Sequence, residues 1–75
     1  MTPYGNLSGD SGVAAYSIGD DFIKLQFRHS PKLYVYDAGR PGLAHVTQMQ
    51  RLAVAGRGLS TYISQNVKKN YSRIE

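Results

Sequence analysis

The segment Gly56-Arg57-Gly58 combines residue types that can bind an anion. It lies between two expected helices, and free amides at the start of a helix carry partial positive charge that attracts phosphate. The glycines let an anion approach closely, and an arginine can hold it with two parallel hydrogen bonds. The structural alternative is a C-cap glycine followed by a flexible turn. The predicted phosphate site comprises Arg51, Gly56, Arg57, Gly58, Lys68 and Lys69.

Three tyrosines form a second group of candidates. Tyr34 and Tyr36 are two residues apart in an expected strand, so their rings point to the same face. Such a pair can stack on nucleic-acid bases, or it can cover the core beneath the helices. Tyr71 follows Lys68 and Lys69 in a basic segment that either tracks a nucleic-acid backbone or is a solvated helix end. We treat Tyr34, Tyr36 and Tyr71 as stacking candidates and leave both interpretations open.

Residues for catalysis or metal binding are sparse. The chain has no cysteine, which excludes disulfides, thiolate metal sites and a cysteine nucleophile. His29 and His45 have no carboxylate or second histidine at metal-ligand spacing. No phosphate-binding P-loop, dinucleotide fingerprint or nucleophile elbow occurs. We therefore expect a protein that is not an enzyme, with no catalytic residue, no metal and no cofactor.

Charge is distributed unevenly along the 75 residues, whose formal net charge is +4. Residues 1–37 carry three basic and four acidic residues, whereas residues 38–75 carry six basic residues and one acidic residue, Glu75. A one-sided basic surface attracts phosphate-rich partners. The simpler alternative is that these charges keep a small domain soluble.

Strand patterns occupy the first half of the chain. Residues 1–12 lack hydrophobic periodicity and predict a flexible N-terminal arm. Residues 22–28 alternate strictly, which places Ile23, Leu25 and Phe27 on one face. With 13–18 and 33–37, this run predicts three antiparallel strands joined by short turns.

The hydrophobic period then changes from two to 3.6. Apolar residues at three- and four-residue spacing predict helices over 41–55 and 59–71. The expected architecture is α+β: a three-stranded antiparallel β-meander followed by two α-helices packed on one face, all within a single domain of residues 13–75. The predicted core comprises Ile23, Leu25, Phe27, Val46, Met49, Leu52, Ile63 and Val67.

Several short motifs resemble the KTSC family, small domains named for the C-terminus of some lysyl-tRNA synthetases. Tyr34-Val35-Tyr36 matches the family's Tyr-x-Tyr motif, and Val67-Lys68-Lys69-Asn70-Tyr71 is similar to its I-K-x-x-Y pattern. Ala53-Val54-Ala55 is similar to the end of its first helix. The family usually shows Ser-x-Gly before the second helix, where this chain has Gly58-Leu59-Ser60. The resemblance spans about residues 13–71 and implies RNA binding by association with the synthetases.

Three functions fit these observations. The first is a non-catalytic module that binds RNA or single-stranded DNA. The second is a homo-oligomer, for instance one encoded by a phage or a bacterium, that sequesters a small signalling nucleotide at a subunit junction. The third is a protein–protein adaptor that uses exposed edge strands. The short apolar runs exclude a membrane span and a secretory signal peptide, so we expect a cytoplasmic protein without a membrane partner.

Overall fold

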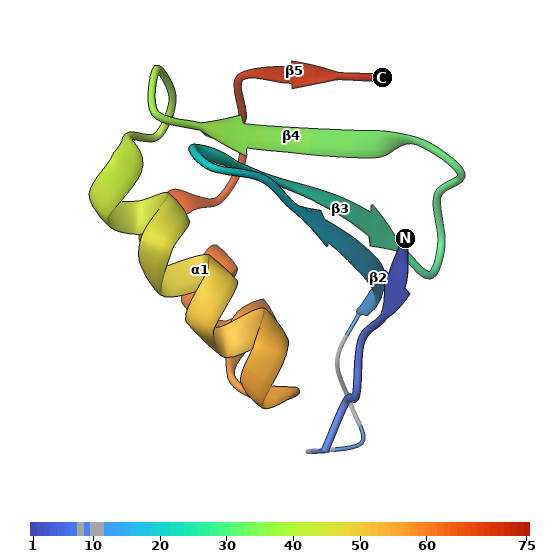
Figure 1. Cartoon of the computed structure of the whole chain (residues 1–75). Helices are drawn as coiled ribbons and strands as arrows, with labels where there is room; N and C mark the ends of the chain where they lie inside the picture. Colours follow the sequence, from blue (N-terminus) through green and yellow to red (C-terminus); the bar gives the residue numbers. More distant parts are fainter. Residues whose placement is uncertain (8, 10–11) are drawn as a thin grey trace.

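Three central strands form the antiparallel meander that the sequence predicts (Figure 1). They are β2 (Val13–Ile18), β3 (Phe22–Phe27) and β4 (Leu33–Asp37). The computed structural model describes residues 1–7, 9 and 12–75. In the register of these strands, Leu25 lies opposite both Tyr16 and Tyr34. The two tyrosines therefore share the inner face of the sheet with the apolar residues of β3.

Two short edge strands extend the sheet to five strands within the described residues, which corrects the expected number of three. They are β1 (Thr2–Pro3), paired with β2, and β5 (Arg73–Ile74), paired with β4. Each has two residues, too few to show an alternating pattern in the sequence. The chain termini consequently lie at opposite edges of the sheet (Figure 1).

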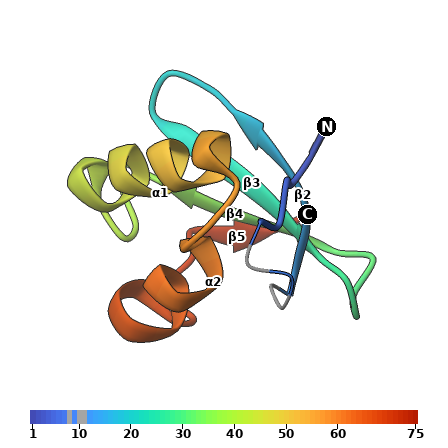
Figure 2. The same cartoon turned by 90° about the horizontal axis from the view of Figure 1, so that it is seen from below.

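The helical layer lies on one side of the sheet (Figure 2). It consists of α1 (Leu43–Ala55), α2 (Leu59–Tyr62) and the π-helix η1 (Ile63–Val67), which continues directly from α2. A hydrogen bond of 2.7 Å between His45 Nδ1 and Tyr62 Oη joins α1 to α2.

The second helix ends four residues earlier than the predicted boundary at residue 71. Lys68 adopts φ 44° and ψ −118°, which takes the backbone out of the helical region. The amide of Asn70 then donates to the carbonyl of Val67 and closes a tight turn. This turn sends the chain back to the sheet as β5.

The core matches the sequence prediction at six positions and differs at two. Ile23, Leu25, Val46, Met49, Ile63 and Val67 are buried, as predicted. Phe27 and Leu52 are only partly buried and pack against the edge of the core. Their periodicity placed them on the correct face, but periodicity does not show where a small core ends.

The N-terminal segment contributes to this core. Residues 2–4 fall within the arm that the sequence predicts to be flexible, yet β1 is paired and Tyr4 is buried. The amide of Leu59 donates to the Tyr4 hydroxyl at 3.3 Å, which connects the N-terminus to the start of α2. Residues 8 and 10–11 of the predicted arm lie outside the described residues.

Candidate functional site

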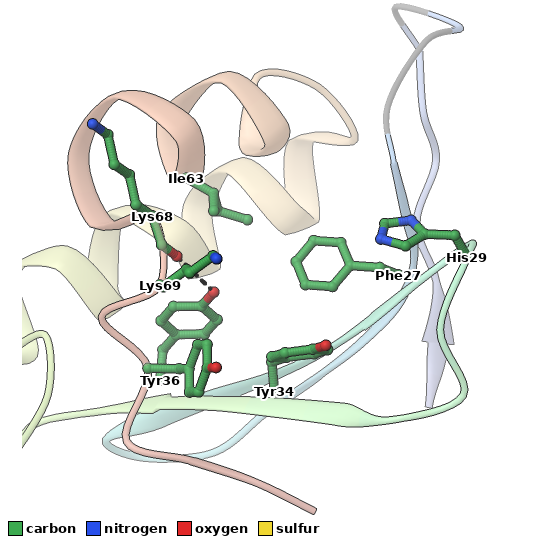
Figure 3. A pocket seen from close by; sticks show the side chains of 8 residues that line it. Phe27, His29, Tyr34, Tyr36, Ile63, Lys68 and Lys69 are labelled. Carbon is green, nitrogen blue, oxygen red and sulfur yellow. Dashed lines mark hydrogen bonds between the residues drawn. The ribbon is translucent and has the colours of Figure 1, made fainter.

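A pocket of about 220 Å³ opens between the inner face of the sheet and the turn that follows η1 (Figure 3). It is partly open to solvent. Its lining is mainly aromatic, with basic residues at the rim. The lining residues are Phe27, His29, Tyr34, Tyr36, Ile63, Lys68, Lys69 and Tyr71.

Edge-to-face contacts hold the aromatic rings of the pocket in place. The Tyr34 ring lies 5.2 Å from the rings of both Phe27 and Tyr71, at interplanar angles of 69° and 74°. Tyr71 also contacts Tyr36 at 6.1 Å and 87°. These arrangements are favourable for aromatic pairs, because a ring edge carries positive and a ring face negative partial charge. Tyr34 and Tyr71 are only partly buried, so both present ring surface to a ligand.

Tyr36 forms the floor of the pocket. Its side chain is 1% exposed, and its hydroxyl donates to the backbone carbonyl of Lys68 at 3.3 Å (Figure 3). Burial, with smaller contributions from Tyr71 and Tyr34, raises the pKa of the Tyr36 phenol from 10.0 to about 12. The core interpretation of the Tyr34–Tyr36 pair therefore holds for Tyr36, whereas Tyr34 lies where a ligand can reach it.

The stability of the protein should consequently fall as the pH rises from 10 to 12. In this window the unfolded chain has released the phenolic proton while folded Tyr36, with a pKa of about 12, retains it, so ionisation favours unfolding. Tyr36→Phe removes this contribution. We expect urea unfolding at about pH 9 and about pH 11 to show a larger loss of stability for the wild type than for Tyr36→Phe. Equal losses would contradict the burial of this hydroxyl.

Two lysines line the pocket, and only one of them directs its side chain toward it. The Lys69 side chain points toward the pocket, whereas the Lys68 side chain extends outward and its backbone carbonyl accepts from the Tyr36 hydroxyl (Figure 3). Among the described residues no salt bridge involves either lysine, and no carboxylate lines the pocket. Both positive charges are therefore available to an anionic ligand.

The nearby carboxylates are held on the opposite face of the sheet. Glu75 accepts from Lys24 at 2.9 Å and pairs with Arg73 at 3.0 Å, and Arg73 also approaches Asp37 at 3.9 Å. The hydrogen bonds from Lys24 and Arg73 lower the pKa of Glu75. This arrangement keeps these negative charges away from the pocket, on the face of the sheet where Lys24 and Arg73 flank Val35.

Lys68 stands in a backbone conformation that favours glycine. Its φ of 44° brings the side chain close to its own backbone, at a cost of about 1–2 kcal/mol for a residue with a Cβ atom. We expect Lys68→Gly to raise the free energy of unfolding by up to about 1 kcal/mol, because glycine relieves the strain but gains entropy in the unfolded chain. Lys68→Ala, which keeps the Cβ atom, is the matched control. Urea denaturation that ranks Ala above Gly would contradict this conformation.

The six residues of the predicted phosphate site do not converge on one place. Lys68 and Lys69 line the aromatic pocket, while Arg51 lines a separate hollow beside α1. Arg57 is exposed and lines neither of the two hollows.

The two glycines of the predicted phosphate site, Gly56 and Gly58, lie at helix ends and have backbone roles. Gly56 is the C-cap of α1 with φ 78°, and its amide donates to the carbonyls of Leu52 and Ala53. Gly58, with φ 82°, precedes α2, whose first amide, that of Leu59, already donates to the Tyr4 hydroxyl. This geometry corresponds to the C-cap alternative.

Sequence reasoning missed Phe27, His29 and Ile63 as pocket residues. Phe27 was assigned to the correct face of its strand, and the register places that face beside Tyr34. His29 was considered only as a metal ligand, although its ring lies 6.2 Å from that of Phe27. The sequence analysis assigned Phe27 and Ile63 to the core alone, although it left Tyr34 and Tyr36 open between core packing and stacking.

The described part of the chain holds no group of three or more His, Cys, Asp or Glu residues placed to bind a metal ion. Within the same residues, none of the helices has the length and apolar character needed to cross a membrane. Comparisons with protein-family models, curated proteins and solved structures found no match to this chain.

Proposed function

We propose that the protein is a non-catalytic module that binds RNA or single-stranded DNA through the aromatic pocket. One observation carries the proposal: partly exposed Tyr34 and Tyr71 share a pocket with Lys69, and no carboxylate lines it in the part of the chain that the structure describes. Aromatic rings that accept bases beside lysines that attract phosphates are the usual elements of single-strand recognition.

The size of the pocket favours one base of a strand over an enclosed nucleotide. Pockets that enclose whole small molecules typically measure roughly 300–1,000 Å³. The volume here is about 220 Å³, which suits a single inserted ring. The adjoining phosphates would then lie outside the pocket, on the side where the Lys69 side chain points toward it.

The resemblance to the KTSC family supports the same location, and we propose that the chain is a member. Its two main motifs, Tyr34-Val35-Tyr36 and residues 67–71, are far apart in the sequence. In the structure, Tyr34, Tyr36, Lys68, Lys69 and Tyr71 all line the one pocket.

Titration of a labelled oligonucleotide tests this proposal. Single-stranded RNA, single-stranded DNA, a duplex of equal length and a mononucleotide are compared at two salt concentrations. We expect single strands to bind best and binding to weaken as salt rises, because protein contacts release condensed counterions. A duplex keeps its bases stacked inside and cannot place one in the pocket.

Two variants with the same loss of charge locate the site. Lys69→Ala should weaken single-strand binding more than Arg57→Ala, which removes a positive charge away from the pocket. Equal weakening would indicate a diffuse charge effect or a site at the α1–α2 connection. Preferential binding of the mononucleotide would favour the nucleotide-sequestering function, and no binding to any phosphate ligand at low salt would favour the adaptor.

A further inference from the structure

A second hollow, of about 460 Å³, lies between α1 and the end of β2. It is lined by Ile18, Thr47, Gln50, Arg51 and Val54. Its apolar members are exposed to an unusual degree, at 40% for Ile18 and 72% for Val54. Leu43, one helical turn before Thr47, is 52% exposed on the same side of α1. We call these six residues the α1 flank.

The α1 flank is separate from the side of α1 that enters the core. Leu43, Thr47, Gln50 and Val54 are spaced by four, three and four residues, which aligns them along the helix. The buried residues Val46, Met49 and Ala53 form the parallel row that packs on the sheet. The helix thus has two rows that contain apolar residues, and only the row of Val46, Met49 and Ala53 is buried within the chain.

Charges of both signs border the α1 flank. Gln50 Nε2 donates to the carbonyls of Gly19 and Phe22, both at 2.9 Å, which fixes the β2–β3 turn against α1. That turn carries Asp20 and Asp21, both exposed, and Arg51 is exposed within the flank. Among the described residues, none of these three charges forms a salt bridge.

We propose that the α1 flank binds a second copy of this chain in a symmetric dimer. A two-fold axis places the same surface of both copies face to face. A residue on one side of this surface therefore contacts a residue on the opposite side of it in the other copy. Arg51 of each copy would face the Asp20–Asp21 turn of the other, with Ile18 and Val54 packed between them.

The charge pattern at the α1 flank favours a second copy of this chain as the partner. The chain carries a formal net charge of +4, so two copies repel one another on average. At the α1 flank one positive and two negative charges border an apolar centre, so two identical copies are complementary there. The apolar contacts would supply most of the affinity, and the charge pairs would fix the orientation.

Dimerisation at this surface leaves the aromatic pocket accessible. None of the residues that the structure describes lines both hollows. The patch is also small compared with the roughly 20–30 residues that each partner contributes to a stable interface, so we expect a dimer that forms measurably below ~1 mM and dissociates on dilution.

A charge-swap experiment tests the dimer. Sedimentation equilibrium over a concentration series gives the dissociation constant of the full chain. Arg51→Glu, and separately Asp20→Lys with Asp21→Lys, should each weaken self-association by at least about 10-fold through like-charge contacts. An equimolar mixture of the two variants should restore association, because each then meets the opposite charge. Lys32→Glu, at an exposed position in the β3–β4 turn, is the control with the same change of charge as Arg51→Glu.

The outcomes are distinct. A wild-type chain that stays monomeric at ~1 mM overturns the proposal. So does association that neither charge variant weakens, or a mixture that stays monomeric. If a charge variant unfolds by circular dichroism, Val54→Glu at a position 72% exposed replaces it, and unchanged association of Val54→Glu overturns the proposal equally.

Discussion

Replacing Leu25 by alanine is expected to lower the free energy of unfolding by about 2–5 kcal/mol. Leu25 is 0% exposed and lies between Tyr16 and Tyr34 at the centre of the sheet, so the truncation leaves a cavity that rigid strands cannot fill. Small domains have a total stability of only a few kcal/mol, so much of the variant should be unfolded near room temperature.

Leu43→Ala is the matched control for this prediction. The chemical change is the same, but Leu43 is 52% exposed and has little burial to lose. Urea denaturation at low protein concentration measures both variants. A Leu25→Ala protein as stable as Leu43→Ala would contradict the assigned inner face of the sheet.

The second large effect is expected at Tyr34. Stacking of a base on an aromatic side chain is worth about 1–3 kcal/mol, so Tyr34→Leu should weaken single-strand binding by roughly 5- to 150-fold. Tyr34→Phe keeps the ring and should retain most of the affinity. Tyr16→Leu removes a tyrosine of the inner face that does not line the pocket, and should bind normally.

This series separates stacking from packing. Tyr34 also contacts Phe27 and Tyr71, so the thermal stability of each variant is measured beside its affinity. Loss of binding in a folded Tyr34→Leu protein supports a base in the pocket. Equal affinity of the Leu and Phe variants would exclude a stacking role for this ring.

The sequence predicts the central strands well because their signal is local. Alternation at Ile23, Leu25 and Phe27 marks the inner face of β3, and Pro41 with Gly56 brackets the first helix closely. The sequence does not predict β1 and β5, because a two-residue strand is too short to show an alternating hydrophobic pattern. Their pairing depends on the rest of the fold. The early end of η1 depends on one unusual residue, Lys68.

The candidate site was predicted only in part, for a related reason. Its tyrosines and lysines could be named individually, but they come from β4 and from the turn after η1, which only tertiary packing brings together. The local pattern at Gly56-Arg57-Gly58 was more conspicuous. Glycines in such a pattern can end a helix as readily as they can bind an anion. In this structure Gly56 is the C-cap of α1.

Nuclear magnetic resonance of the ¹⁵N-labelled protein, titrated with a short single-stranded RNA, tests the central claim most directly. The aromatic pocket predicts that the largest amide shifts fall at Tyr34, Lys69 and Tyr71, with little change at Gly56 and Arg57. Shifts concentrated at the α1–α2 connection, with the pocket residues unchanged, would contradict the pocket as the binding site.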